Sequence, residues 1–162
     1  MTAAELAGYV QRVRVFIASP ALTVGTSESW HHWLRTPELA KSCDFIGAHI
    51  FPYWSGVPAE AAVDEVGRRY DELKAAFPGK AIVISETGWP SAGPTIKGAA
   101  PSLPAQEQFA RGFLARAAAE RYDYNFAEAF DQPWKGKDIE GMTGASWGVF
   151  GEKREPKIPL VR

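Results

Sequence analysis

Glu86 is the residue whose position in the sequence most clearly indicates chemistry. It closes the apolar run at residues 81–85 and is followed at once by Thr-Gly-Trp-Pro-Ser. A carboxylate at the end of a buried strand loses solvation unless it is hydrogen-bonded, and such a group can attack the anomeric carbon of a sugar. The simpler alternative is an ordinary carboxylate in a turn or at a helix N-terminus, and that alternative prevails if the neighbouring residues are ignored.

The six tryptophans lie on, or just past, the ends of expected strands, and none lies in a long expected helix. They are Trp30, Trp33, Trp54, Trp89, Trp134 and Trp147. The C–H faces of a sugar stack on aromatic rings while its hydroxyls bond to carboxylates and amides, so this pattern indicates a carbohydrate-binding surface. Taken singly, each ring could instead close the core beneath a loop. Glu28, Glu128 and Asp131 are further carboxylates near strand ends, and we expect Glu128 to face the site or an ion pair.

Other chemistries are disfavoured. Residues 25–29 begin like a nucleophile elbow but lack its closing glycine. The sequence contains neither a Gly-x-Gly-x-x-Gly nor a Walker A motif, which disfavours nucleotide binding. His31 and His32 are adjacent and therefore diverge on a helix, which disfavours a metal site. Cys43 is the single cysteine, which excludes an internal disulfide. We expect neither a metal nor a cofactor.

The composition is that of one globular domain. The chain has 162 residues, of which 46% are hydrophobic and 23% charged, and its formal net charge is −1. The hydrophobic fraction excludes a disordered chain, and the lack of a basic surplus argues against binding to nucleic acid. No apolar run approaches the roughly 18 residues of a membrane span. Residues 1–5 resemble a helix start rather than a signal peptide.

The expected elements alternate between helix and strand. Helical periodicity covers residues 2–17, where Thr2 and Glu5 form a capping-box pattern, then 58–77 and 104–121, with a shorter helical piece at 37–42. The expected strands are residues 21–25, 44–50, 81–85, 125–130 and 145–150. This order predicts an α/β fold with parallel strands, whose carboxyl ends meet at one edge. The loop at residues 92–103 is either functional or a mobile surface connection.

Four segments resemble motifs of glycoside hydrolase family 17, the β-1,3-glucanases and related glucan transglycosylases. Residues 84–91 (ISETGWPS) resemble its nucleophile motif, and residues 128–135 (EAFDQPWK) resemble its motif at the eighth barrel strand. Residues 46–54 are similar to its sixth-strand segment and residues 146–150 to its final strand-end motif. The likeness covers nearly the whole chain and is greatest to bacterial members.

The resemblance implies a retaining mechanism on β-linked glucose chains, with Glu86 as the nucleophile. It also implies which residues line the glucose subsites: Tyr53, Trp89, Asp131, Trp134, Lys135 and Trp147, with Glu28, His49 and Glu128 as polar contacts. The implied partner is a β-glucan oligosaccharide. A periplasmic or extracellular location would suit the parent enzyme, although nothing in this sequence fixes localisation.

One feature of the family is missing. Its proton donor is a glutamate that follows an asparagine at the end of the fourth strand, whereas the single asparagine here, Asn125, is followed by Phe126. The chain therefore corresponds to strands five to eight, half of a (β/α)8 TIM barrel that needs roughly 250 residues when closed. Retaining hydrolysis requires two carboxyl groups about 5–5.5 Å apart. We expect the chain alone to be weak or inactive, since Glu28 on the fifth strand is a poor substitute.

A half barrel would leave two open sheet edges and an uncovered inner face. We therefore expect it to close, either by self-association into a homo-oligomer or with a complementary N-terminal half barrel. Two other functions stay open. One is a non-catalytic module that binds glucan or self-associates, and the other is a small flavodoxin-like binder, for which a phosphate-binding loop is lacking.

Overall fold

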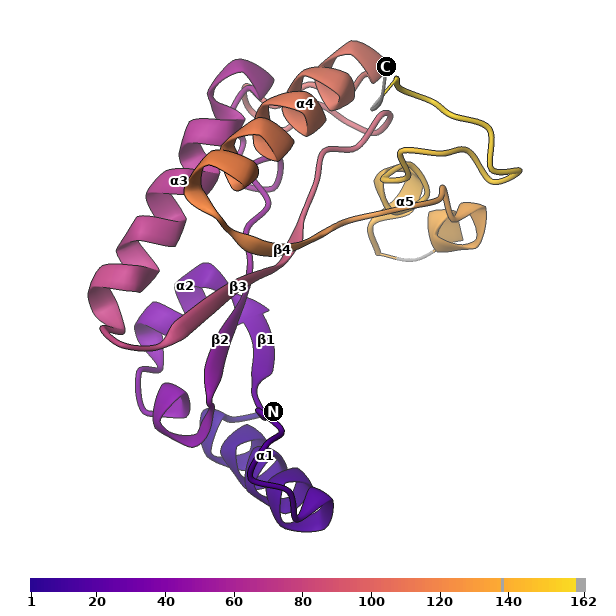
Figure 1. Cartoon of the computed structure of the whole chain (residues 1–162). Coiled ribbons are helices and arrows are strands. Elements are labelled where there is room, and N and C mark those ends of the chain that lie inside the picture. Colours follow the sequence, from indigo (N-terminus) through magenta and orange to yellow (C-terminus); the bar gives the residue numbers. More distant parts are fainter. Residues whose placement is uncertain (138, 160–162) are drawn as a thin grey trace.

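The computed structural model describes residues 1–137 and 139–159. Its sheet has four parallel strands in the order β1-β2-β3-β4 (Figure 1). The strands are β1 (Thr26–Ser29), β2 (Phe45–His49), β3 (Ala81–Thr87) and β4 (Asp123–Phe126). The predicted α/β class, with about four parallel strands connected by helices, is confirmed.

The long helices lie where the periodicity predicts them. They are α1 (Ala3–Ile17), α3 (Ala59–Ala76) and α4 (Leu103–Glu120), with shorter helices α2 (Trp30–Arg35) and α5 (Gly141–Gly144) and 3-10 turns at Leu39–Ser42 and Pro133–Lys137. The expected capping box begins α1: the Thr2 hydroxyl accepts the Glu5 N–H at 3.2 Å, and the Glu5 carboxylate accepts the Thr2 N–H at 2.7 Å. No described helix is both long and apolar enough to cross a membrane.

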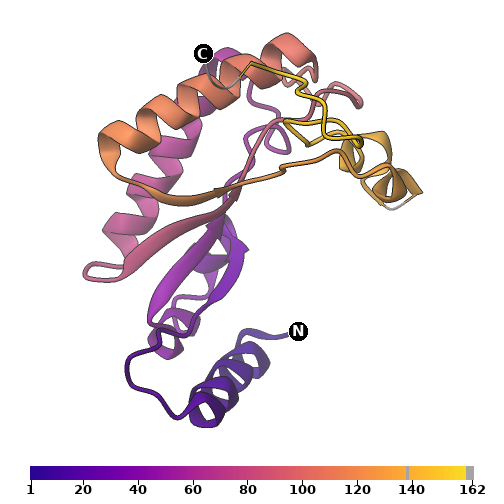
Figure 2. The same ribbon diagram turned by 45° about the vertical axis from the view of Figure 1, so that its right-hand side comes forward.

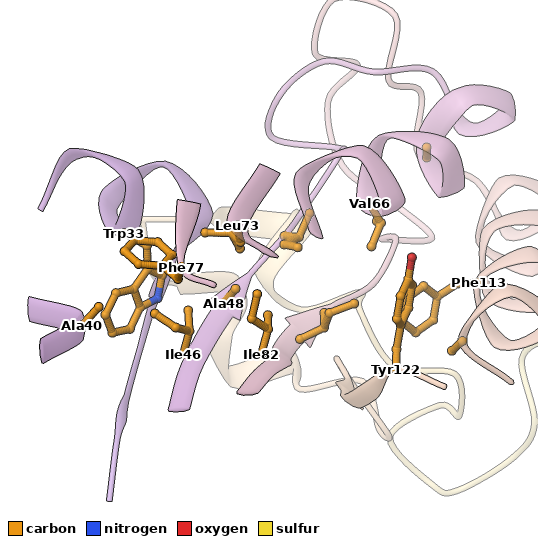
Figure 3. Packing of buried hydrophobic residues seen from close by; sticks show 14 of the residues in the cluster. Trp33, Ala40, Ile46, Ala48, Val66, Leu73, Phe77, Ile82, Phe113 and Tyr122 are labelled. Atoms are coloured by element: carbon orange, nitrogen blue, oxygen red, sulfur yellow. The ribbon is translucent and has the colours of Figure 1, made fainter. Parts of the chain in front are cut away.

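The helices cover only one face of the sheet. Figures 1 and 2 show α2, α3 and α4 along the same side. The main core lies between this face and the helices, where Ile46, Ala48 and Ile82 of the strands pack with Trp33 and Leu73 (Figure 3). No helix within residues 1–137 and 139–159 lies across the opposite face. One face of the sheet is thus covered by helices, and the opposite face is open.

The first expected strand is misplaced. Residues 21–25 only lead into β1, which begins at Thr26 because parallel pairing with β2 begins there, Thr26 opposite Ile46. Consequently Trp30 and Trp33, expected just past the end of a strand, lie in the short helix α2. The β3 strand continues past its expected end at residue 85 to Thr87, so Glu86 lies inside it.

The last two expected strands are also corrected. The fourth strand is found at Asp123–Phe126 instead of residues 125–130. Residues 145–150 form no strand: they follow α5, and only Phe150 makes isolated bridges, to Phe130 and Pro156. The reason is that this segment lies beyond the end of β4, where its backbone bonds to residues 128–132 rather than to the sheet.

Asp44 joins α1 to the start of the sheet. Its Oδ2 atom accepts hydrogen bonds from the Arg14 guanidinium and from the Val24 N–H, each at 2.7 Å. The second Arg14 nitrogen donates to the Ser42 carbonyl at 3.2 Å. The Arg14 hydrogen bond, followed by that of Val24, holds the pKa of Asp44 below its ordinary value of 3.8.

Asp44→Asn should therefore destabilise the protein in a pH-dependent way. The pKa of Asp44 is lower in the folded chain than in the unfolded chain, so the ionised carboxylate stabilises the fold at about pH 4 and above. This stabilisation is lost as the pH falls through the pKa of Asp44 in the folded chain. We expect the variant to unfold at a lower urea concentration than the wild type at pH 7, and the difference to shrink in acid well below pH 3.8. Urea titrations followed by circular dichroism measure this, and a difference of equal size at both pH values would contradict it.

Candidate active site

Glu86 lies at the edge where the carboxyl ends of the strands meet. Parallel pairing places it opposite His49, with 3.8 Å between Glu86 Oε1 and His49 Nε2. The surrounding backbone is held by the Ile50 N–H, which donates to the Glu86 carbonyl at 2.9 Å, and by the Thr87 hydroxyl, which donates to the Ile50 carbonyl at 2.8 Å. The Glu86 side chain is 49% exposed, so a ligand can reach its carboxylate.

Two adjoining hollows flank Glu86, of about 160 Å³ and about 370 Å³. Both are lined by Glu86, Phe51, Trp54 and Glu140. The first is completed by Ala127, Glu128, Lys135 and Trp147, and the second by Ser29, Trp30, His31, His49 and Ser55. Carboxylates, a cation and indole rings therefore face the same space, a combination that is suited to binding a sugar.

An aromatic cluster forms the wall and floor of these hollows. The ring centroid of Trp147 lies 5.0 Å from that of Phe51 and 5.9 Å from that of Tyr53, and the Tyr53 and Trp54 centroids are 4.8 Å apart. Trp54 is 41% exposed, whereas Tyr53 and Trp89 are fully buried beneath the surface rings. The Tyr53 hydroxyl donates to the Pro94 carbonyl at 2.7 Å, so the loop at residues 92–103 is packed under the site.

Glu128 and Lys135 form a charged wall on one side. The Lys135 ammonium and the Gln132 amide both donate to the Glu128 carboxylate. The backbone of Glu128 is bonded in turn to the neighbouring segment, through the Trp147 carbonyl at 3.2 Å and the Val149 N–H at 3.0 Å. Glu128 thus both faces the hollow and belongs to an ion pair.

Some residues of the site carry no clear signal in the sequence. Glu140 lines both hollows but belongs to none of the four motifs. Phe51 and Trp54 follow β2 and belong to the motif at residues 46–54, and Trp54 is one of the six tryptophans that the sequence singles out. Gln106 is fully buried on α4, and its amide nitrogen lies 2.9 Å from the Trp89 carbonyl and 3.1 Å from that of Gly148. It therefore joins the loop after β3 to the segment that carries Trp147.

Five of the expected sugar contacts line neither hollow: Tyr53 and Trp89 are buried beneath the surface rings, and Asp131, Trp134 and Glu28 lie elsewhere. Asp131 accepts hydrogen bonds from the Lys157 ammonium and from a backbone N–H. Trp134 is exposed, with the Lys135 ammonium 5.6 Å from its ring centroid. Glu28 is in register with Ala48, whose side chain belongs to the helix-covered core, so Glu28 shares that face of the sheet.

The expectation that all six tryptophans form one ligand surface is wrong. Trp33 packs edge-on against Phe77 in the core, and its indole donates to the Gly47 carbonyl at 2.7 Å (Figure 3). Trp89 is also fully buried. Trp30 does line the second hollow, with the Arg69 guanidinium 3.6 Å from its ring centroid. The tryptophans thus divide between core and site: Trp33 and Trp89 are fully buried, whereas Trp30, Trp54 and Trp147 line a hollow.

His31 gives the second hollow a titratable group. Its Nε2 atom lies 3.1 Å from the Ser29 hydroxyl. Partial burial of the ring, and then the charges of Arg35, His32 and Arg69, lower the pKa of His31 below its ordinary value. The neutral imidazole, which can both donate and accept a hydrogen bond, is therefore favoured at neutral pH. Among the described residues, no group of three or more histidines, cysteines or carboxylates is placed to hold a metal ion.

Comparison with known proteins gives consistent matches. Residues 1–148 match the family model described as the BtgE/BtgC glycoside hydrolase domain. A glucan 1,3-beta-glucosidase of Arthroderma benhamiae is 30% identical over 154 residues, which cover 86% of this chain and 50% of that protein.

Solved structures show the same relation. A glycoside hydrolase family 17 β-1,3-glucanosyltransferase from Rhizomucor miehei aligns with a TM-score of 0.88 and 31% identity, over 99% of this chain and 58% of that one. An active-site mutant of the Rhizomucor enzyme, in complex with laminaritriose, aligns with a TM-score of 0.87. The predicted match to part of a (β/α)8 barrel is confirmed, and the chain spans about half the length of these relatives.

Gly88 should not tolerate a side chain, because a Cβ atom there would lie 1.8 Å from the Ala127 carbonyl oxygen. We expect Gly88→Ala to lower the free energy of unfolding by about 2 kcal/mol or more, since one of the two backbones must move. Gly8→Ala in α1 is the matched control: its Cβ would have nothing within 4 Å, so it should stabilise by about 0.5–1 kcal/mol. Urea unfolding measures both, and equal effects would contradict the close approach.

Proposed function

Because the chain belongs to the BtgE/BtgC glycoside hydrolase domain family, we propose that it is the C-terminal half of a retaining β-1,3-glucan hydrolase or transglycosylase. In this proposal residues 1–162 form a single domain that corresponds to strands five to eight of the barrel. The observation that carries the proposal is the accessible carboxylate of Glu86 between two hollows walled by aromatic rings.

Glu86 would act as the nucleophile. Its carboxylate would attack the anomeric carbon of the bound glucosyl unit, and the bond to the leaving oxygen would break to give a covalent glycosyl-enzyme. Water, or a hydroxyl group of a second glucan, would then displace Glu86 and restore the original configuration. His49, whose Nε2 lies 3.8 Å from the carboxylate, is placed to orient it.

The leaving oxygen needs a proton, and this sequence lacks the glutamate that donates it in the family. A retaining enzyme places its proton donor about 5–5.5 Å from the nucleophile. The sequence contains no Asn-Glu pair to supply the family's donor. Losing general acid catalysis typically costs a factor of about 10²–10⁴ in rate, so weak or absent hydrolysis follows.

The remaining groups would bind glucose units. Trp54 and Trp147 would stack on the C–H faces of the sugar, while Glu128, Lys135 and His49 would bond to its hydroxyls. Tyr53 and Trp89 would act from below by supporting the surface rings. Glu28, Asp131 and Trp134 enter only through the family resemblance, since they lie outside the two hollows.

Titration of the purified chain with laminaritriose, followed by calorimetry, tests this function. We expect measurable binding, and we expect Trp54→Ala to weaken it about tenfold because a stacking surface is lost. Val15→Ala, at an exposed position of α1 that lines neither hollow, should leave the affinity unchanged. Absence of binding by the wild type would contradict the proposal. If the wild type hydrolyses laminaritriose and Glu86→Gln abolishes this activity, only the expectation that the chain alone is weak or inactive is refuted.

A second candidate, a self-associating half barrel, is favoured by two observations. The helix α1 exposes the apolar side chains of Tyr9, Val13 and Phe16, and the open face of the sheet adjoins an unpaired β1 edge within the described residues. Exposed apolar groups of this kind usually mark a contact surface. The chain would then close against a complementary N-terminal half barrel or against a second copy of itself.

Size-exclusion chromatography with light scattering distinguishes these possibilities. For self-association we expect a dimer whose fraction rises with protein concentration, and we expect Phe16→Glu to shift it to monomer because the charge would be buried in the contact. The control Leu103→Glu, at an exposed apolar position of α4, should leave the dimer intact. A monomer at every concentration would contradict self-association.

A further inference from the structure

Lys157 joins segments that lie far apart in the sequence. Its ammonium donates to Asp131 Oδ1 and to the Ser91 hydroxyl, each at 2.7 Å. The Lys157 and Asp131 side chains are only 13% and 21% exposed. A partly buried ion pair of this kind is costly to break from one side, because the partner is left as an uncompensated charge.

Asp131 extends this contact to the segment that carries Trp147. The same Oδ1 atom accepts the Gly148 N–H at 3.0 Å, and the Asp131 N–H donates to the Phe150 carbonyl at 2.9 Å. Lys157 itself donates its backbone N–H to the Val149 carbonyl at 3.0 Å. The backbones approach so closely that a Cβ at Gly148 would lie 2.0 Å from the Asp131 nitrogen.

The segments joined in this way also carry the wall of the first hollow. Trp147 directly precedes Gly148, and its carbonyl accepts the Glu128 N–H at 3.2 Å. The Ser91 N–H donates to the Ser146 carbonyl at 2.9 Å. Backbone hydrogen bonds therefore link Asp131 and Ser91 to the segment of Trp147, and that segment to Glu128. A displacement of Asp131 or Ser91 would displace Trp147 and Glu128 as well.

We propose that Lys157 is a positioning residue for glucan binding, which acts through Asp131 to hold Trp147 and Glu128 in place at the Glu86 hollow. It does not touch the sugar, because the hollows around Glu86 include neither Lys157 nor Asp131. The choice of ligand rests on the proposed function, whereas the positioning itself is a property of the folded chain.

The competing interpretation is that Lys157 only anchors the end of the chain. Its neighbour Ile158 is buried against Val149 and Ala110, so this segment also packs on α4. An anchor of that kind would affect stability without changing the environment of Trp147. The two interpretations therefore differ in whether the indole N–H signal of Trp147 changes when Lys157 is replaced.

The test compares the indole N–H signals of the six tryptophans in the ¹⁵N-labelled chain. We expect Lys157→Met to shift the signals of Trp147 and of its neighbour Trp54, while those of Trp30 and Trp33 stay in place. The matched control is Lys153→Met, an exposed lysine of the same segment, which should move none of them. Unmoved Trp147 and Trp54 signals, or equal shifts of all six, would overturn the positioning role.

Asp131→Asn provides a second variant should Lys157→Met fail to fold. It keeps an oxygen for the Gly148 N–H but removes the charge that holds Lys157, so it should shift the same two indoles by a smaller amount. Laminaritriose affinity completes the test, with a loss of about fivefold or more expected for Lys157→Met. If Lys157→Met binds laminaritriose as tightly as the wild type, the inference is overturned. If the wild type binds no laminaritriose, the proposed function is overturned instead.

Discussion

The parallel pairing of β2 with β3 is the constraint on which the candidate active site depends. Parallel strands end at the same edge, so residues far apart in sequence, such as His49 and Glu86, become neighbours there. The packing of Ile46 and Ala48 against the helices leaves the other face of β2 for His49. A slip of one residue would turn each side chain to the opposite face and dismantle the site.

A second level of organisation lies outside the sheet. Residues 127–135 and 145–159 contain little regular structure, yet backbone hydrogen bonds join them to each other and to the loop that follows β3. Polar side chains, chiefly the buried Gln106 and the partly buried Asp131–Lys157 pair, complete these connections. Irregular backbone can thus present Trp147 and Glu128 in a defined arrangement, because its polar groups are satisfied by partners distant in sequence.

The one-sided sheet sets the limits of what this chain can do alone. Helices bury one face, while the opposite face and the β1 edge are open in the part of the chain that the structure describes. In the Rhizomucor relative this chain corresponds to only 58% of the protein. In the proposed function, the carboxyl ends of these four strands supply one wall of the site, and a complete glucan cleft would need a second.

Local physics allowed the sequence by itself to predict the fold class and the three long helices, and to single out Glu86 as a candidate site residue. Helical period and the Thr2–Glu5 capping box act within a few residues, and a carboxylate that interrupts an apolar strand is conspicuous without coordinates. Only the tertiary structure decided which tryptophans belong to the core, that Glu28 shares the helix-covered face, and that Asp131 is paired with Lys157. These outcomes depend on strand register and on contacts between distant segments, which residue types and spacing do not encode.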